Sequence, residues 1–505
     1  MSDSTHPLMK TIPRGVDTKY FDEQTAPQSR FMNPHKVKAS ADLRYDPKNP
    51  GKKILLGKID DQLIGFEDNR HVLTIAGSRA GKSVTLIGNL HLYPGSVLCT
   101  DPKGELAEKS APERAALGQK VVVLDPFLKV TGPAAEYRGT FNPMKTLTPD
   151  NPFIIEDALQ ITDGLVVSSG QEKDPHWNES ASHLIMGVIL FVALSPSIES
   201  SSKNLITVRS YIENALLFKD YPHPEKESET VHLPILLRHV QDCVQHLRGS
   251  ECEDVAEHML GAIRGFYNKS TEERGSVLST AQRHTTFLTF RSMKNVLIED
   301  EKSFDIFDFK NHKPGLSVYL ALPATRIGMC NRWLRLMINQ FIDSVERNET
   351  ETKIPILLAL DEFPVLGFMQ CLQDAAGQVA SLGVKMWVIL QDMGQGKALY
   401  GERFESFAAN AGVTICFGNV DVTTTEYISK RLGQTIIQTT RKSEVTPDQK
   451  STGLSGTIVN EQQYPLMTGD EIARTFARDD PQKRQLVMIA GKRIMILERY
   501  EYFND

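Results

Sequence analysis

The feature that most constrains this sequence is a short run rich in small residues, Ala76-Gly77-Ser78-Arg79-Ala80-Gly81-Lys82-Ser83. An apolar, β-branched segment (VLTIA) precedes the run, and an apolar pattern with helical spacing follows it as far as Pro94. Small residues between a strand and a helix let backbone N–H groups surround phosphate oxygens, and the helix N-terminus adds partial positive charge. The sequence therefore predicts a phosphate-binding loop over residues 77–83.

Two residues of this loop have predicted roles in binding ATP and Mg²⁺. Lys82 is expected to reach the β- and γ-phosphates, and the Ser83 hydroxyl is expected to ligate the metal. The loop departs from the common pattern at its first position, where Ala76 replaces glycine and Gly77 comes next. Alanine is tolerated there if its φ is negative. The alternative, a chance glycine-rich turn, is disfavoured by the strand before the loop and the helix after it.

A second apolar segment, residues 356–360 (ILLAL), ends in Asp361 and Glu362. Because the carboxyl ends of parallel strands form the ligand crevice of an open sheet, we expect these acids beside Lys82. Asp361 would hold Mg²⁺, and Glu362 would orient the attacking water. Gln391 ends the next apolar segment and could sense the γ-phosphate. The alternative for Gln391 is a polar side chain that only satisfies a strand end.

The 505 residues are enough for two to four domains. Residues 1–50 are polar and contain several prolines, which predicts a loosely ordered N-terminal arm. Alternating strands and helices predict an α/β fold with a mostly parallel sheet in residues 51–160 and 300–505, together one discontinuous nucleotide-binding domain. Residues 161–299 show helical apolar spacing without a clear strand, which predicts an inserted all-helical domain.

Charge, cysteine content and the longest apolar run argue against a strongly basic nucleic-acid binder, a disulfide framework and a membrane span. There are 57 Lys and Arg residues against 63 Asp and Glu, a net charge of −6, so any DNA contact must come from a local patch or an assembled ring. The 6 cysteines include no CxxC pair, as expected for a reducing compartment. The longest apolar run, residues 184–194, is shorter than the roughly 20 residues of a membrane span. We therefore expect a cytoplasmic protein with a buried core helix at this run.

Further motifs, in a fixed order, make the chain resemble the coupling ATPases of type IV secretion and conjugation, the TraG/VirD type. The resemblance covers about residues 55–505. The segments that carry it are 100–105 (TDPKGE), 124–127 (LDPF), 141–143 (FNP), 174–177 (DPHW), 361–363 (DEF), 399–401 (LYG), 427–433 (YISKRLG) and 465–472 (PLMTGDEI).

This resemblance implies a RecA-like motor domain, interrupted by the all-helical domain and assembled as a hexameric ring. It implies ATP hydrolysis coupled to delivery of relaxase-bound single-stranded DNA, or of protein effectors, to secretion channel subunits. Family members usually carry N-terminal transmembrane helices, which this sequence lacks, so contact with the inner membrane is expected to be peripheral and through a partner. Two other functions stay open: a nucleotide-gated docking adaptor, and a soluble DNA translocase of the FtsK/HerA kind.

Two weaker patterns also leave alternatives open. Many family members have an arginine before the glutamine strand, where this chain has residues 380–383 (ASLG). The arginines that could instead reach a neighbour's nucleotide are Arg332, Arg335 and Arg431, although a solvated or ion-paired side chain is the plainer interpretation of each. A spacing that could hold a metal, but that a chance surface cluster explains better, occurs at His239, Cys243, His246 and Cys252.

Overall fold

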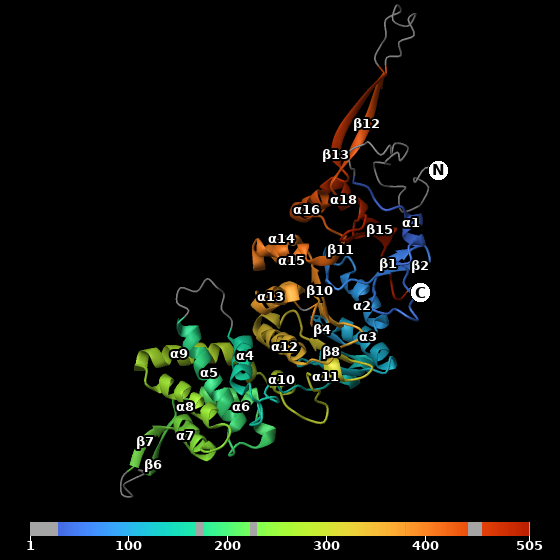
Figure 1. The fold of residues 1–505 in the computed structure, drawn as a ribbon. Coiled ribbons are helices and arrows are strands. Elements are labelled where there is room, and N and C mark those ends of the chain that lie inside the picture. Colours follow the sequence, from blue (N-terminus) through green and yellow to red (C-terminus); the bar gives the residue numbers. More distant parts are fainter. Residues whose placement is uncertain (1–28, 167–175, 223–229, 379, 443–456, 504–505) are drawn as a thin grey trace, which may run out of the picture. The chain divides into compact units, whose positions relative to one another are not determined.

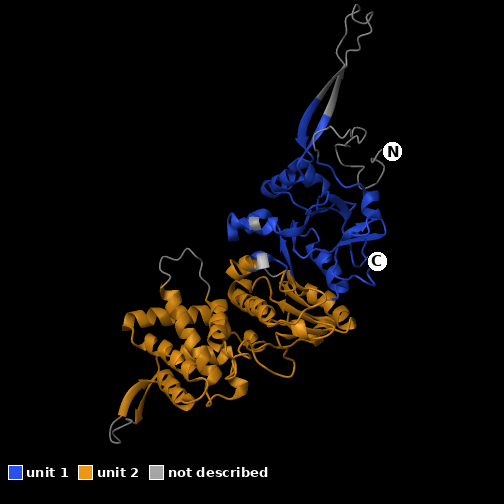
Figure 2. Cartoon of the chain, viewed as in Figure 1, with its two compact units in different colours: residues 1–94, 360–364, 385–505 blue, residues 95–359, 365–384 orange. Residues whose placement is uncertain are grey.

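The computed structural model describes residues 29–166, 176–222, 230–378, 380–442 and 457–503. The chain divides into two compact units, which Figure 2 draws in different colours. Unit 1 comprises residues 1–94, 360–364 and 385–505, and unit 2 comprises residues 95–359 and 365–384. Both units combine strands with helices, so the predicted α/β fold class is confirmed (Figure 1).

Unit 1 is built on strands in the order β2-β1-β15-β14-β11-β3-β10. Their bounds are β1 Ile54–Ile59, β2 Gln62–Phe66, β3 His71–Ala76, β10 Val384–Leu390, β11 Ala411–Phe417, β14 Arg484–Ile489 and β15 Met495–Glu498. The central strand β3 is parallel to both of its neighbours, β10 and β11. The outer strands pair antiparallel, and β14 and β15 form a hairpin at the C-terminal end of the sheet strands.

The helices of unit 1 lie mainly between its strands in the chain. Their bounds are α1 Pro34–Ala39, α2 Lys82–Leu92, α14 Met393–Tyr400, α15 Arg403–Ala409, α16 Val422–Leu432 and α18 Gly469–Thr475. Two further strands pair antiparallel with each other, β12 Gln434–Lys442 and β13 Thr457–Pro465. Residues 443–456 between these strands lie outside the described residues.

The expectation of a loosely ordered arm over residues 1–50 is wrong for its later part. Residues 1–28 lie outside the described residues, but α1 follows them, and Val37, Leu43 and Tyr45 are at most 5% exposed. The chain also runs along β2, where Gly65 N donates to Leu43 O (2.8 Å). These apolar residues are too few and too irregularly spaced to give a periodic signal, so the sequence indicated only a polar loop.

Unit 2 contains strands in the order β9-β4-β8-β5, and β8 is parallel to β4 and to β5. The strand bounds are β4 Val97–Asp101, β5 Lys120–Leu124, β8 Leu316–Ala321 and β9 Ile356–Leu360. The helices that accompany these strands are α3 Glu105–Ala116, α11 Asp308–Asn311, α12 Ile327–Arg347 and α13 Gln370–Gln378. Strands β4, β8 and β9 are buried throughout, and β5 is buried over its last three residues, as is typical of parallel strands with apolar runs.

Between β5 and β8 the chain forms a group of helices. They are α4 Ile154–Leu165, α5 His176–Leu194, α6 Leu205–Glu213, α7 Ile235–Leu247, α8 Glu253–Tyr267, α9 Thr271–Thr285 and α10 Arg291–Lys294. Within the described residues, α5 alone is long and apolar enough to cross a membrane, and 72% of its apolar window is buried. Its buried residues 184–194 form a core helix of unit 2, as predicted.

One part of this segment is not helical, which corrects the expectation of a stretch without strands. Strands β6 (Phe218–Pro222) and β7 (Thr230–Pro234) pair antiparallel. Their side chains are mostly exposed. Each strand spans only 5 residues, and periodicity alone does not distinguish a strand from a helix over so short a run.

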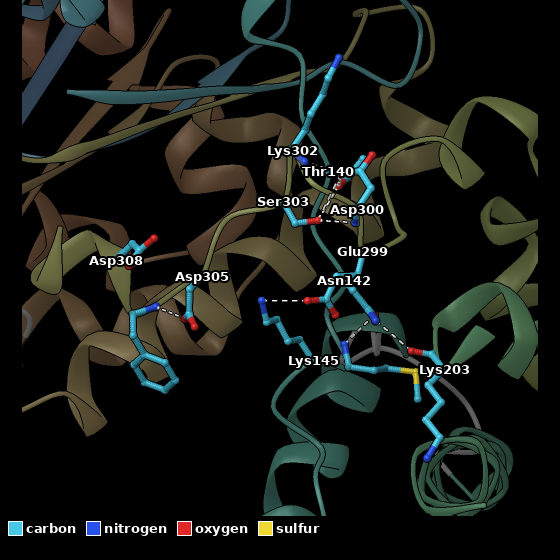
Figure 3. Close-up of polar contacts among 12 residues, drawn as sticks. Thr140, Asn142, Lys145, Lys203, Glu299, Asp300, Lys302, Ser303, Asp305 and Asp308 are labelled. Carbon is cyan, nitrogen blue, oxygen red and sulfur yellow. Dashed lines mark hydrogen bonds and ion pairs between the residues drawn. The ribbon is translucent and has the colours of Figure 1, made fainter. Parts of the chain in front are cut away.

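Two connecting segments of unit 2 lead into and out of the helices, and polar contacts join them (Figure 3). Thr140 Oγ1 donates to Asp300 Oδ1 (2.6 Å), and Lys145 Nζ lies 2.9 Å from Glu299 Oε1. From the same segment, Asn142 Nδ2 donates to the backbone carbonyl of residue 203 (2.9 Å). The FNP motif therefore contributes a structural asparagine to this junction.

Candidate functional site

The predicted phosphate loop lies between β3 and α2. Gly77 N donates to Phe417 O at the end of β11 (3.2 Å), and Ala80 N donates back to Gly77 O (3.2 Å). A Cβ on Gly77 would lie only 2.0 Å from Gly418 O, so glycine is required at this position. Ala76 is buried in β3 and does not have a positive φ. The alanine at the first position of the motif is therefore compatible with the loop.

Two residues in the loop have left-handed backbone conformations, Arg79 with φ 57° and Gly81 with φ 101°. Glycine adopts this region freely, whereas a non-glycine residue costs about 1 kcal/mol or more, a cost often found at binding sites. Gly81 immediately precedes α2 and makes no side-chain cap. The first N–H groups of α2, with their partial positive charge, are therefore not capped by the side chain before them.

Lys82 is the first residue of α2, and its side chain is 8% exposed. Its Nζ lies 3.5 Å from Glu362 Oε1. Glu362 itself has a left-handed backbone, with φ 53°. The next residue, Phe363, is fully buried and stacks on Tyr400 with 5.6 Å between ring centroids. This aromatic anchor fixes the turn that presents the Glu362 carboxylate to Lys82.

Gln391, directly after β10, contacts the same carboxylate. Its Nε2 donates to both Glu362 oxygens, at 3.3 and 3.1 Å. Its backbone is held by two neighbours, since its N–H donates to Gln395 Oε1 (3.1 Å) and its carbonyl accepts from Asn419 Nδ2 (3.4 Å). Gln395 and Asn419 are functional-site residues that the sequence motifs do not predict. Asn419 could have been suspected, because it follows the end of β11 at the same edge of the sheet.

The remaining predicted ligands also lie in unit 1. Asp361 is the first residue after β9 and is 4% exposed, and Ser83 is the second residue of α2. A carboxylate and a hydroxyl are oxygen ligands of the kind that Mg²⁺ takes. A buried ammonium beside a glycine-containing loop at a helix N-terminus suits a triphosphate. The residues present therefore fit ATP with Mg²⁺.

Other acidic residues of the sequence motifs have structural partners in unit 2. Asp101 Oδ2 accepts from Ala107 N (2.9 Å) in the first turns of α3. The Asp125 carboxylate accepts from Lys129 N (2.8 Å) and Val130 N (2.9 Å), which closes the turn after β5. These motifs therefore shape the chain around the strand ends of this unit.

Two of the three candidate arginines are engaged within their own units. Arg335 is 9% exposed, and its Nη1 donates to Leu366 O (3.1 Å) and to Phe368 O. Arg431 Nη1 donates to Thr414 Oγ1 (3.3 Å). The third candidate is Arg332, and the pKa of its guanidinium is lowered by burial and by the nearby Arg283.

The alternative of a metal site in unit 2 finds no support in the structure. Across the part of the chain that the structure describes, no group of three or more His, Cys, Asp or Glu side chains is placed to hold a metal ion. Cys243 is buried, and Cys252 Sγ donates to Pro149 O (3.2 Å). The favoured interpretation of a chance spacing at His239, Cys243, His246 and Cys252 is thus consistent with the geometry.

The parallel strands around β3, with the phosphate loop that follows it, place the chain among the α/β P-loop nucleotide-binding proteins. The amino-acid sequence is more specific than this class. The family described as Type IV secretory system Conjugative DNA transfer matches residues 35–505, and the chain belongs to that family. The resemblance inferred from the sequence motifs is confirmed.

Relatives with known names agree with this assignment. The chain is 26% identical over 420 residues to the conjugal transfer protein TraG of Escherichia coli, covering 80% of this chain and 61% of that protein. It is 26% identical over 484 residues to the type IV secretion system-coupling protein VirD4 of Bartonella quintana (strain Toulouse), covering 91% and 67%. The chain thus spans less than two thirds of the length of that TraG relative.

Solved structures of a coupling protein share the fold. The unbound form of the bacterial conjugative coupling protein TrwBΔN70 matches with a TM-score of 0.61 at 16% identity, over 94% of this chain and 95% of that chain. TrwB in complex with ADP and Mg²⁺ matches with a TM-score of 0.59 at 15% identity, over 94% and 96%. The predicted RecA-like α/β fold is therefore confirmed.

Proposed function

We propose that this chain is a Mg²⁺-dependent ATPase that couples ATP hydrolysis to delivery of DNA, as a relaxase-bound single strand, or of protein substrates to a type IV secretion or conjugation channel. The observation that carries the proposal is the buried Lys82 ammonium, 3.5 Å from the Glu362 carboxylate, at the end of the phosphate loop. Family membership and the names of the TraG and VirD4 relatives support the transport task.

Each residue of the site has a proposed role. ATP supplies the phosphoanhydride bond that is hydrolysed, and Mg²⁺ neutralises part of the charge on the phosphates. The backbone of residues 77–83 and the Lys82 ammonium bind the phosphates, and Ser83 and Asp361 hold the metal. Glu362 orients the attacking water and accepts its proton, and Gln391 holds the Glu362 carboxylate in place.

The domain arrangement and the assembly belong to the same proposal. Residues 51–160 and 300–505 serve as the discontinuous nucleotide-binding domain, and residues 161–299 form an inserted all-helical domain. The helices α4–α10, which occupy most of that inserted range, support this division. The working form is a hexameric ring in the cytoplasm that meets the inner membrane through channel subunits.

Two substitutions test the assignment of the site. Lys82→Ala should lose nucleotide binding, and Glu362→Gln should bind ATP but turn it over about 10²-fold more slowly or worse, because the general base is removed. Lys52→Ala removes an exposed lysine of unit 1 and serves as the matched control. If purified Lys82→Ala hydrolyses ATP like the wild type, the site assignment is wrong.

The transport task is tested by steady-state ATP turnover with and without single-stranded DNA. Stimulation by DNA supports the motor. Turnover too slow to move a substrate and indifferent to DNA favours the docking adaptor instead. Neighbouring genes for a relaxase and channel subunits support coupling to a secretion channel, whereas a nuclease partner favours a soluble translocase.

A further inference from the structure

The first residue after β15, Arg499, contacts the phosphate loop from outside the predicted site. It is 6% exposed, and its Nη1 donates to Ala80 O. Its Nε (3.2 Å) and its backbone N–H (2.9 Å) both donate to Lys483 O. The guanidinium carbon lies 5.0 Å from the centroid of the Phe417 ring, at the end of β11. One planar guanidinium thus connects the C-terminal strand, β11 and the loop.

The acceptor of this contact lies at the most constrained point of the loop. Ala80 stands between Arg79 and Gly81, which both have positive φ values of 57° and 101°. The peptide between Ala80 and Gly81 is trans, so the carbonyl of Ala80 and the N–H of Gly81 point in opposite directions. A donor that fixes this carbonyl therefore also fixes the direction of one of the N–H groups with which such a loop binds phosphate.

The residues after Arg499 continue along α2. A Cβ on Gly88 would lie 2.7 Å from Tyr500 Cδ1, so Tyr500 packs directly on this helix. The ring of Tyr502 meets that of His91 edge to face, with 5.1 Å between centroids. The C-terminal segment 499–502 therefore braces both the loop and the helix that begins with Lys82.

We propose that Arg499 is a positioning residue for nucleotide binding, which holds the Ala80 carbonyl so that the Gly81 N–H faces the bound phosphates. The inference rests on the proposed function, since it requires a nucleotide in the loop. Lysine could not replace this arginine fully, because a single ammonium lacks the planar fork that reaches two carbonyls while lying over an aromatic ring. In addition, Nη2 is buried without a hydrogen-bond partner within the described residues, so protein acceptors do not use the whole guanidinium.

A purely structural role for Arg499 would affect stability, whereas a positioning role must affect nucleotide affinity in a folded protein. The variants Arg499→Lys and Arg499→Ala separate the two roles. The first keeps the aliphatic stem and the charge, and the second can be supplied with free guanidinium ion. Arg493→Ala is the matched control, because Arg493 is an exposed arginine on the turn between β14 and β15.

The experiment is a titration of each full-length protein with fluorescent ADP and Mg²⁺, alongside thermal melting without nucleotide. We expect Arg499→Ala to bind ADP about tenfold or more weakly, as for loss of a buried charged hydrogen bond. Arg499→Lys should be weakened to a smaller extent, with a melting temperature near that of the wild type. Guanidinium ion at millimolar concentration should restore affinity to Arg499→Ala, and Arg493→Ala should bind like the wild type.

The results distinguish this inference from the function on which it rests. Wild-type affinity in both Arg499 variants overturns the positioning role, as does weaker affinity that follows only a loss of folding and is not restored by guanidinium. Failure of the wild-type protein to bind ADP with Mg²⁺ contradicts the proposed function instead.

Discussion

Lys82 and Glu362 come from distant parts of the chain, yet their side chains lie 3.5 Å apart between Nζ and Oε1. The lysine begins the helix after the phosphate loop, and the glutamate ends the turn after β9. Because the pair is largely shielded from water, each charge depends strongly on the position of the other. Whatever contacts Lys82 therefore influences the carboxylate proposed to orient the attacking water.

Replacing Gln391 tests how that carboxylate is held. Gln391 Nε2 donates to both Glu362 oxygens, so Gln391→Ala should release the carboxylate without removing a phosphate ligand. We expect ATP turnover to fall about tenfold or more, since positioned acid–base groups supply such factors, while ADP affinity stays near that of the wild type. Steady-state turnover and ADP titration check this split. The control Gln463→Ala, an exposed residue of β13, should match the wild type, and weaker ADP binding by Gln391→Ala would contradict the interpretation.

Gly77→Ala should damage the loop by sterics alone. The added Cβ would lie 2.0 Å from Gly418 O, a distance that forces the loop away from β11. We expect nucleotide affinity to fall at least about tenfold, with a smaller effect on melting temperature, because the loop is a local feature of unit 1. Gly261→Ala is the control, since no atom lies within 4 Å of its Cβ and alanine favours a helix. Wild-type affinity in Gly77→Ala would show that this loop does not bind the phosphates.

Most elements of the fold could be predicted because their apolar residues are continuous or strictly periodic. Strands β3 and β10 are buried runs bounded by polar residues, and α5 is apolar over most of its length. The elements that were missed, α1 and the β6–β7 hairpin, bury few side chains. Their conformations depend on local capping and strand pairing, which leave little apolar pattern in a sequence.

The residues of the candidate site also divide into those that the sequence predicts and those that it does not. Lys82, Glu362 and Gln391 could be predicted, because each lies beside the end of a strand that the sequence already reveals. Asn419 and Arg499 could not, since their contacts depend on tertiary pairing. Asn419 reaches Gln391 O because β11 runs parallel to β3, and Arg499 reaches Ala80 because β15 ends near the phosphate loop.

In unit 2, the buried hydroxyl of Thr140 should contribute more to the free energy of unfolding than the exposed ion pair of Lys145 and Glu299. Lys145 and Glu299 are 40% and 44% exposed, so their coupling free energy in a double-mutant cycle should be below about 1 kcal/mol. Thr140 is 5% exposed and donates to Asp300, so Thr140→Val should lower the free energy of unfolding by about 1–2 kcal/mol. Denaturant unfolding of the variants measures both quantities. A larger cost for breaking the ion pair than for Thr140→Val would contradict this ranking.

His284 should make the helices of unit 2 sensitive to acid. Its ring is 2% exposed, and Nε2 lies 3.0 Å from Asn178 Oδ1. Burial, with smaller contributions from Arg332 and Arg283, lowers the pKa of His284 to about 4. In the unfolded chain the pKa is about 6.5, so between these values the unfolded state binds a proton that the folded state does not. Stability is therefore lost as the pH falls through this window, by up to about 1.4 kcal/mol per pH unit.

A His284→Gln variant removes this titration, while an amide can still contact Asn178. Unfolding by urea at about pH 7 and about pH 5 should show a smaller loss of stability on acidification in the variant than in the wild type. His258→Gln, at an exposed histidine of α8, should keep the wild-type dependence. Carboxylates titrate in the same range in all three proteins. Only the difference in acid-induced loss of stability between the wild type and His284→Gln therefore reports on His284. Equal losses in wild type and His284→Gln would mean that the buried imidazole accepts its proton as readily when folded as when unfolded.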